Sequence, residues 1–162
     1  MRTAAAGVVA ALMISSAQAA DNTPIERLAT CQDSWFEWQK NDPPRLQAFV
    51  AAFKAGFERK ANDAFFVPKS PQSLAGLPIA QAFPQSVGMG VGFSVVVDAG
   101  FDKTKAAVEK KIGRPISHCE PPSDNMRTCE LQLGDKKTVT LLAEDKPTAT
   151  RTLVGCYYFY EK

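Results

Sequence analysis

The sequence predicts an α+β fold, in which an N-terminal helical hairpin and one further helix pack on an antiparallel β-sheet of about five strands. Three observations support this prediction. Apolar residues recur at helical spacing between residues 23 and 57, they alternate with glycine and serine between residues 87 and 98, and three alternating segments fill the C-terminal third. Helices followed by a run of strands are typical of the α+β class.

The N-terminus has the pattern of a secretory signal peptide. Arg2 provides a positive charge, an apolar run follows from Ala4 to Ile14, and Ala17-Gln18-Ala19 is a small-x-small cleavage site. The run is shorter than the roughly 20 residues that span a bilayer, and no later segment is apolar enough to do so. We therefore expect residues 1–19 to be removed, residues 20–162 to form a single domain, and the protein to reach the periplasm or the extracellular space.

Positive and negative charges are nearly balanced. The chain has 19 Lys and Arg residues against 17 Asp and Glu residues, and removal of residues 1–19 takes away one cation, Arg2. Nucleic-acid binding requires a clustered basic excess. The balance argues against nucleic acid as a partner.

Four cysteines follow the predicted cleavage site: Cys31, Cys119, Cys129 and Cys156. They predict two disulfides in an oxidising compartment, with three possible connectivities. Cys119 and Cys129 flank a turn-forming cluster at residues 121–125, so we expect them on adjacent strands of a hairpin, which leaves Cys31 with Cys156. Because the cysteines are expected to be oxidised and His118 is the single histidine, neither a metal nor a cofactor is expected.

Two helices are predicted before residue 60. The first starts at the capping box Thr23-Pro24-Ile25-Glu26 and runs to about Trp38. Asp42 caps the second, whose apolar face extends to Phe57. The aromatic cluster at residues 35–38 is interpreted as core packing, with an aromatic binding box as the alternative.

The segment 62–86 has the weakest pattern. Residues 64–68 suggest a short strand, and two prolines reduce residues 77–83 to an edge strand or an ordered loop. Because loops on a scaffold often carry binding groups, Lys69 and Gln85 are candidate binding residues. A plain connecting loop is the alternative.

The run from Val87 to Asp98 has the clearest strand pattern. Its odd positions are apolar, whereas glycines and Ser94 occupy the even positions, so one face is an apolar row and the other is nearly bare. Glycine in a strand marks the close approach of another group. A helix, an aromatic side chain from a neighbouring strand and a ligand all fit. The alternating glycines do not match a phosphate-binding loop.

One helix and three strands are predicted next. Asp102 is the expected N-cap of a helix from Lys103 to Ile112, and Gly113 is expected to end it. Its basic outer face fits a solvated surface, or alternatively an acidic partner. The strands are predicted at Arg127 to Leu133, Lys137 to Ala143 and Thr152 to Tyr160.

The last of these strands is rich in aromatic residues. One face has Leu153, Gly155, Tyr157 and Phe159, and the other has Val154, Cys156, Tyr158 and Tyr160. Rings from this strand would cover the glycines if the two strands are neighbours. Exposed tyrosines would instead be good anchors for a partner, and Tyr158 and Tyr160 are the candidates.

The run from Phe101 to Pro115, followed by Cys119, Cys129 and three strands, resembles the repeat unit of β-lactamase inhibitory protein-like domains. It is similar also to the small outer-membrane assembly lipoproteins of that superfamily. The resemblance covers residues 101–160 and depends on a helix, a Gly-x-Pro exit and a hairpin cysteine pair. It implies a curved antiparallel sheet that has helices on one face and binds another protein.

Groups suited to catalysis are scarce in the sequence. One histidine and four oxidised cysteines leave no nucleophile and base pair, and the carboxylate pair of Asp98 and Asp102 includes a predicted cap. We expect a non-enzymatic periplasmic binding protein that docks a protein through its sheet or aromatic C-terminal strand. The alternative is a small-ligand carrier or a small hydrolase-like enzyme that uses the loop 69–86 and the glycine face of strand 87–98. The partner's identity and the oligomeric state stay open.

Overall fold

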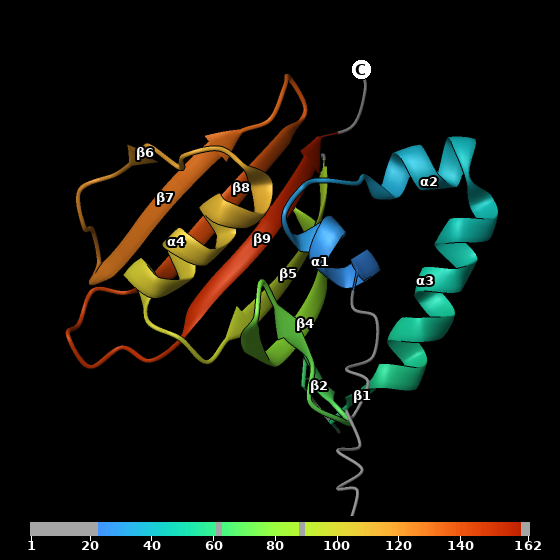
Figure 1. The fold of residues 1–162 in the computed structure, drawn as a ribbon, viewed down its shortest axis with the longest axis horizontal. Coiled ribbons are helices and arrows are strands. Elements are labelled where there is room, and N and C mark those ends of the chain that lie inside the picture. The colour runs from blue at the N-terminus through green and yellow to red at the C-terminus, as the bar shows by residue number, and fades with distance from the viewer. Residues whose placement is uncertain (1–22, 61–62, 88–89, 160–162) are drawn as a thin grey trace, which may run out of the picture.

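The computed structural model describes residues 23–60, 63–87 and 90–159, and confirms an α+β fold with an antiparallel sheet (Figure 1). The helices are α1 (Thr23–Ala29), α2 (Trp35–Asn41), α3 (Pro43–Gly56) and α4 (Phe101–Ile112). The strands are β1 (Phe57–Arg59), β2 (Phe66–Pro68), β3 (Ser73–Leu74), β4 (Leu77–Val87), β5 (Gly90–Val97), β6 (His118–Cys119), β7 (Met126–Gln132), β8 (Lys137–Glu144) and β9 (Thr152–Phe159). The predicted signal peptide lies outside the described residues. Within them, no helix has the length and apolar character needed to cross a bilayer.

Within the described ranges the sheet has nine strands, not the predicted five or so. Their order is β1-β2-β4-β5-β9-β8-β7-β6, with β3 beside β4, and the sheet does not close. Strands β1, β3 and β6 are only two or three residues long. An alternating pattern needs about four residues before it can be recognised, so β1 and β3 were not predicted, and β6 was expected only as the hairpin strand that carries Cys119.

The predicted helical hairpin is wrong, because its first helix is broken in two. Cys31 has a positive φ of 56°, which no residue inside a helix adopts. The N–H groups of Gln32 and Asp33 both donate to the Arg27 carbonyl, at 2.8 and 3.2 Å, and end α1. The Ser34 hydroxyl then accepts the Glu37 N–H at 3.5 Å and starts α2. Residues 23–56 therefore form three helices before the first strand.

Of the predicted ends of the other two helices, the Asp42 cap and the Gly113 end are confirmed, whereas Phe57 belongs to β1. The Asp42 carboxylate accepts the Arg45 N–H at 3.2 Å and caps α3, which runs to Gly56. Gly113 ends α4 with a left-handed φ of 69°. Asp102, however, is not the N-cap, because α4 begins at Phe101, two residues before the predicted start, and Gly100 is the N-cap. The Asp102 side chain contacts Arg127 instead.

The central strand β5 starts at Gly90, three residues later than predicted. Val87 belongs to β4 and pairs with Gly90, and residues 88–89 between them lie outside the described residues. The segment 77–83, predicted as an edge strand or a loop, is part of β4. A proline has no N–H to donate to a neighbouring strand. Since β2 pairs with β4 at one position only, Phe66 with Ala82, the prolines of β4 cost few hydrogen bonds on that side.

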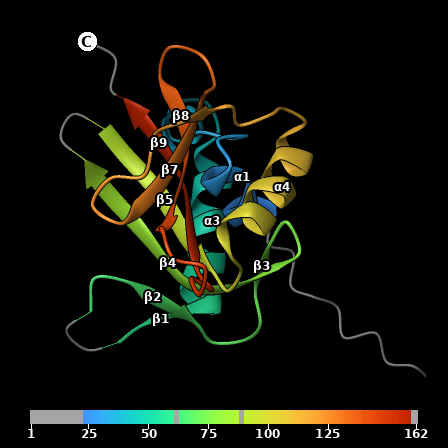
Figure 2. The ribbon, with the colours of Figure 1, turned by 90° about the vertical axis from the view of Figure 1, so that its left-hand side faces the viewer.

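The helices cover one face of the sheet, and Figure 2 shows α1 and α4 on the same side of β4 and β5. The aromatic cluster at residues 35–38 contributes to this core, as predicted. Trp38 is buried, and its ring centroid lies 5.7 Å from that of Phe49 in α3. Phe49 in turn contacts Phe93 of β5 edge to face at 5.6 Å. Helix α2 thus reaches the sheet through α3.

Both predicted disulfides are present. Cys31, just after α1, is bonded to Cys156 of β9, and Cys119 of β6 is bonded to Cys129 of β7. The first closes a loop of 125 residues and joins the helical layer to the middle of the sheet. The second joins two neighbouring strands over 10 residues.

Candidate functional site

The two faces of the sheet differ in what covers them. On the face toward the helices, Val95, Val154 and Leu141 lie in register on β5, β9 and β8, and each is 0% exposed. On the opposite face many of the side chains are half-buried, and no described helix lies over them. We call this opposite face the open face, and its half-buried residues are Gln81, Phe83, Val96, Met126, Thr128, Glu130, Thr138, Leu142, Leu153 and Tyr157.

An apolar row crosses the middle of the open face. Leu153 pairs with Val96 on one side and with Leu142 on the other, so three aliphatic side chains lie on three adjacent strands. Directly opposed residues of antiparallel strands have Cβ atoms about 5 Å apart, so these side chains are in contact. Phe83, on the next strand along, is paired with Ser94, two residues before Val96. The open face therefore has an aliphatic and aromatic surface on a rigid support.

Tyr157 covers the bare glycine position of β5 on this face. It is paired with Gly92, and a Cβ atom added to Gly92 would lie 2.9 Å from Tyr157 Cδ1 and 3.2 Å from the Cys156 carbonyl oxygen. Of the three occupants that the sequence left open, the aromatic side chain of a neighbouring strand is present here. The surroundings of Gly88 and Gly90 lie outside the described side chains.

The centre of the open face is flat. A Cβ atom on Gly155 would collide with the side chain of Ser94, and both residues are buried. On β8, Thr140 is also buried and donates its hydroxyl proton to Glu130 Oε1 at 3.1 Å. Glu130 is the one charged residue among the half-buried residues named above. The face therefore combines an apolar row with the half-buried carboxylate of Glu130 on β7, and the exposed Glu144 lies on the same face at the end of β8.

Tyr158 is not the exposed anchor that the sequence suggested. It is 2% exposed, and its hydroxyl donates to the carbonyl oxygens of Leu28 at 3.0 Å and Asp33 at 2.6 Å. Burial raises the pKa of the Tyr158 hydroxyl, which stays protonated and able to donate. Its role is to fasten β9 to the end of α1. Tyr160, the second predicted anchor, lies outside the described residues.

The other two candidate binding residues do not lie in one site. Lys69 is exposed, and its Nζ donates to the carbonyl of Lys54 at 2.9 Å while its N–H donates to that of Gly56 at 2.9 Å. It therefore attaches the loop to the end of α3. Gln85 is paired with Gly92 through the β4–β5 ladder, and its side chain is not described. Binding by either residue stays a prediction.

An ion-pair cluster below Tyr158 was missed in the sequence. Asp33 accepts from Arg27 Nε at 2.6 Å and from Arg45 Nη2 at 2.7 Å. The hydrogen bond from Arg27 holds the pKa of the Asp33 carboxyl below its ordinary range, despite the opposing effect of burial. The cluster fixes the turn that carries Cys31 and one of the carbonyl acceptors of Tyr158. The predicted helical spacing continues across residues 30–34, so no local signal in the sequence marks the cluster.

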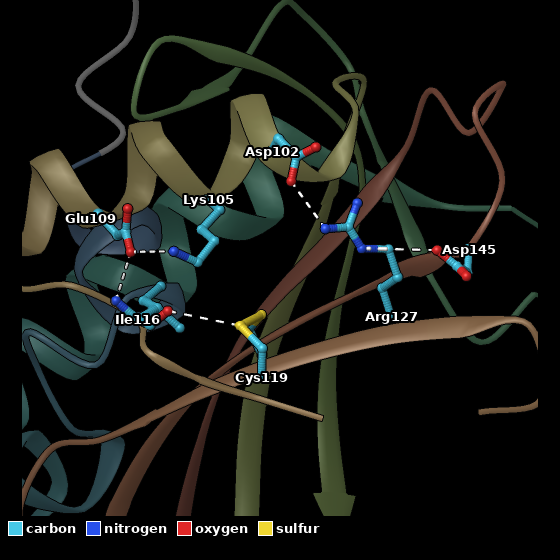
Figure 3. Close-up of a disulfide and its surroundings, with 8 residues drawn as sticks. Asp102, Lys105, Glu109, Ile116, Cys119, Arg127 and Asp145 are labelled. Carbon is cyan, nitrogen blue, oxygen red and sulfur yellow. Dashed lines mark hydrogen bonds and ion pairs between the residues drawn. A yellow bond between two sulfur atoms is a disulfide. The ribbon is translucent and has the colours of Figure 1, made fainter. Parts of the chain in front are cut away.

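A second feature that the sequence did not predict is a hollow of about 370 Å³ between α4 and the β6–β7 hairpin (Figure 3). Its lining residues are Phe101, Asp102, Lys105, Cys119, Glu120, Pro122, Arg127, Thr128 and Cys129. The Arg127 guanidinium lies 4.4 Å from the Phe101 ring centroid and donates to Asp102 at 3.1 Å. The hollow is distinct from the glycine face on which the small-ligand alternative depended.

The cations around this hollow already have anionic partners. Arg127 Nε also lies 3.9 Å from Asp145, and Lys105 Nζ lies 2.6 Å from Glu109 (Figure 3). The hydrogen bonds from Lys105 and from the Ile116 N–H hold the pKa of Glu109 below its ordinary range. Among the residues that the structure describes, no group of three or more His, Cys, Asp or Glu side chains could hold a metal ion.

The likeness of residues 101–160 to β-lactamase inhibitory protein-like domains stays a prediction, as does export to the periplasm. The structure shows a sheet with one face covered by helices and one face half-exposed, and the Cys31–Cys156 disulfide joins the sheet to the helical layer. No family model, curated protein or solved structure matches the chain.

Proposed function

We propose that the chain is an exported, non-enzymatic binding protein that docks another protein through the open face of its sheet. The observation that carries the proposal is the apolar row of Val96, Leu153 and Leu142, which the helices leave uncovered. Burial of apolar surface stabilises an interface by about 25 cal/mol per Å² before the costs of association. A partner that covers this row would gain that free energy.

The support below the open face favours recognition without rearrangement. The Cys31–Cys156 disulfide, the Tyr158 hydroxyl and the Phe49 and Phe93 contact hold the strands from the covered side. A rigid surface loses little conformational entropy when it binds. Tyr157, which lies across Gly92 on the open face, provides a large contact area with a polar tip. In the proposal Tyr157 replaces Tyr158 as the aromatic anchor.

Two further observations bear on the proposal. Two disulfides are typical of proteins in an oxidising compartment, which supports export. The ring of Tyr157 occupies the space above Gly92, which counts against a small ligand there and favours protein binding over the carrier or hydrolase alternative.

Photo-crosslinking in cells that export the protein tests the proposal. A benzophenone side chain is introduced at Leu153 on the open face and, as a control, at the exposed Ala52 on α3. We expect a discrete crosslinked protein from position 153 and none from position 52. The same adduct from both positions, or none from position 153, would show that the open face is not a docking surface.

A further inference from the structure

The two disulfides have different surroundings. Cys31 and Cys156 are 2% and 0% exposed and lie inside the core. Cys119 is exposed, and both Cys119 and Cys129 line the hollow of about 370 Å³ beside α4. A small dithiol fits in a space of this size. The Cys119–Cys129 bond is therefore within reach of a thiol reagent in the native fold, whereas Cys31–Cys156 is not.

Strand β6 is held on the sheet by few interactions besides this disulfide. Its two residues, His118 and Cys119, are exposed and pair only with Glu130 and Cys129 of β7. The next residue, Glu120, donates its N–H to the Thr128 carbonyl at 3.1 Å. Loss of the disulfide would leave the rest of the core intact, because both residues of β6 are exposed.

The segment that carries β6 is anchored at both ends. On one side Ile116 is 0% exposed and donates its N–H to Glu109 at 2.7 Å. On the other side a tight turn closes with two hydrogen bonds between Ser123 and Met126, at 3.2 and 2.8 Å. Residues 117–122 can consequently leave the β7 edge without unfolding what precedes or follows them.

A hydrogen-bond acceptor for the reduced state is already in place. Cys119 Sγ lies 3.9 Å from the carbonyl oxygen of Ile116, as Figure 3 shows. A disulfide sulfur has no proton to donate, so this contact becomes a hydrogen bond only when Cys119 is a thiol. The geometry thus provides a partner for Cys119 in its reduced form.

We propose that Cys119–Cys129 is a site of thiol–disulfide exchange with a dithiol, and that its reduction releases β6 from β7. One thiolate of the dithiol attacks the exposed Cys119 sulfur, the bond to Cys129 breaks, and Cys129 leaves as a thiolate that takes a proton from water. The second thiol of the reagent then attacks the mixed disulfide and releases Cys119 as a thiol. The protein disulfide is reduced by two electrons and the dithiol is oxidised to its own disulfide.

Release of β6 has a structural consequence for the sheet. Strand β7 becomes the terminal strand, and its N–H and C=O groups between Thr128 and Glu130 lose their partners in residues 118–120. An unpaired strand edge is a template for pairing with another strand. Thr128 and Glu130 also belong to the open face. The redox state of the Cys119–Cys129 bond therefore determines whether β6 or β7 forms the edge strand beside that face.

Native-state reduction with dithiothreitol tests the proposal on the full oxidised chain. Free thiols are trapped with iodoacetamide at a series of times and located by peptide mapping. We expect Cys119 and Cys129 to be labelled at least about tenfold faster than Cys31 and Cys156. With glutathione at short times, the mixed disulfide is expected on Cys119. A double variant, Cys119→Ser with Cys129→Ser, should fold and should show no native-state labelling.

Hydrogen exchange separates release of β6 from a wider opening. After selective reduction, the Glu120 amide should lose protection while the Ile116 amide keeps it. Equal labelling of all four cysteines, labelling only at the rate of global unfolding, or joint loss of protection at Glu120 and Ile116 would overturn the proposal.

Discussion

The two faces of the sheet belong to the same strands, but the side chains on them differ in burial. On β9, Val154 is fully buried under the helices, whereas Leu153, one residue earlier, is half-buried on the open face. The same step separates Val95 from Val96 on β5 and Leu141 from Leu142 on β8. The covered face holds the fold together, and we expect the half-buried side chains of the open face to be replaceable without loss of the fold. Substitutions of adjacent residues can therefore separate stability from binding.

The largest expected effect comes from a charge on the covered face. Val154→Asp places a carboxylate among fully buried side chains with no cation beside it, and should cost about 3 kcal/mol or more of the free energy of unfolding. Leu153→Asp places the same charge on the open face and should cost about 1 kcal/mol or less. Urea unfolding of both variants makes the comparison. If the two variants lose equal stability, the distinction between the faces is wrong.

The next largest effect is expected at the glycine under Tyr157. Gly92→Val would bring a side chain against the Tyr157 ring and the Cys156 carbonyl, and should cost about 2 kcal/mol. Removal of the ring should recover part of this cost, so Gly92→Val should be less harmful in a Tyr157→Ala background. A double-mutant cycle by thermal unfolding measures the coupling. Additive effects would show that the ring does not occupy the space above Gly92.

A smaller effect separates the two adjacent tyrosines. Tyr158→Phe leaves the carbonyls of Leu28 and Asp33 without their buried donor and should cost about 1.5 kcal/mol. Tyr157→Phe removes a hydroxyl from a half-exposed ring and should change stability by less than about 0.5 kcal/mol. Chemical denaturation of both variants is sufficient. A larger loss for Tyr157→Phe than for Tyr158→Phe would reverse the assignment of the faces.

The smallest expected effect is the dependence of folding stability on pH, which comes from Asp33 on the covered side of the sheet. Because the folded state lowers the pKa of Asp33, this carboxyl adds stability above its ordinary range, near pH 4, and loses it as the pH falls through the folded-state pKa. Asp33→Asn should be less stable than the parent at neutral pH, and the difference should shrink in acid. Glu130→Gln on the open face should leave the Asp33 contribution in place. Melting temperatures measured from pH 7 to pH 2 test both.

The covalent framework could be predicted from the sequence, because spacing alone placed Cys119 and Cys129 in a hairpin and left Cys31 with Cys156. The assignment of Tyr158 failed for a physical reason. Alternation separates a strand into two faces but does not say which one meets the helices. Cys156 shares its face with Tyr158, and its bond to Cys31 in the helical layer identifies that face as the covered one. Because Tyr158 is on the same face of β9 as Cys156, the predicted Cys31–Cys156 disulfide would have placed Tyr158 in the core.

Other parts of the structure leave no trace in a local pattern. The break at Cys31 depends on hydrogen bonds from residues 32 and 33 back to Arg27, and on an ion pair that reaches forward to Arg45. The hollow beside α4 forms only when Phe101 and Arg127 meet across elements that are distant in sequence. Such features depend on tertiary contacts, so helical and strand periodicity could not predict them.

The affinity of the crosslinked partner for three forms of the protein tests the docking proposal most directly. The forms are the parent, Leu153→Asp on the open face and Ala52→Asp on the exposed side of α3. A carboxylate buried at an apolar interface costs several kcal/mol, so the account predicts binding at least about tenfold weaker for Leu153→Asp and unchanged for Ala52→Asp. Equal affinity of the parent and Leu153→Asp, with both forms folded, would contradict it.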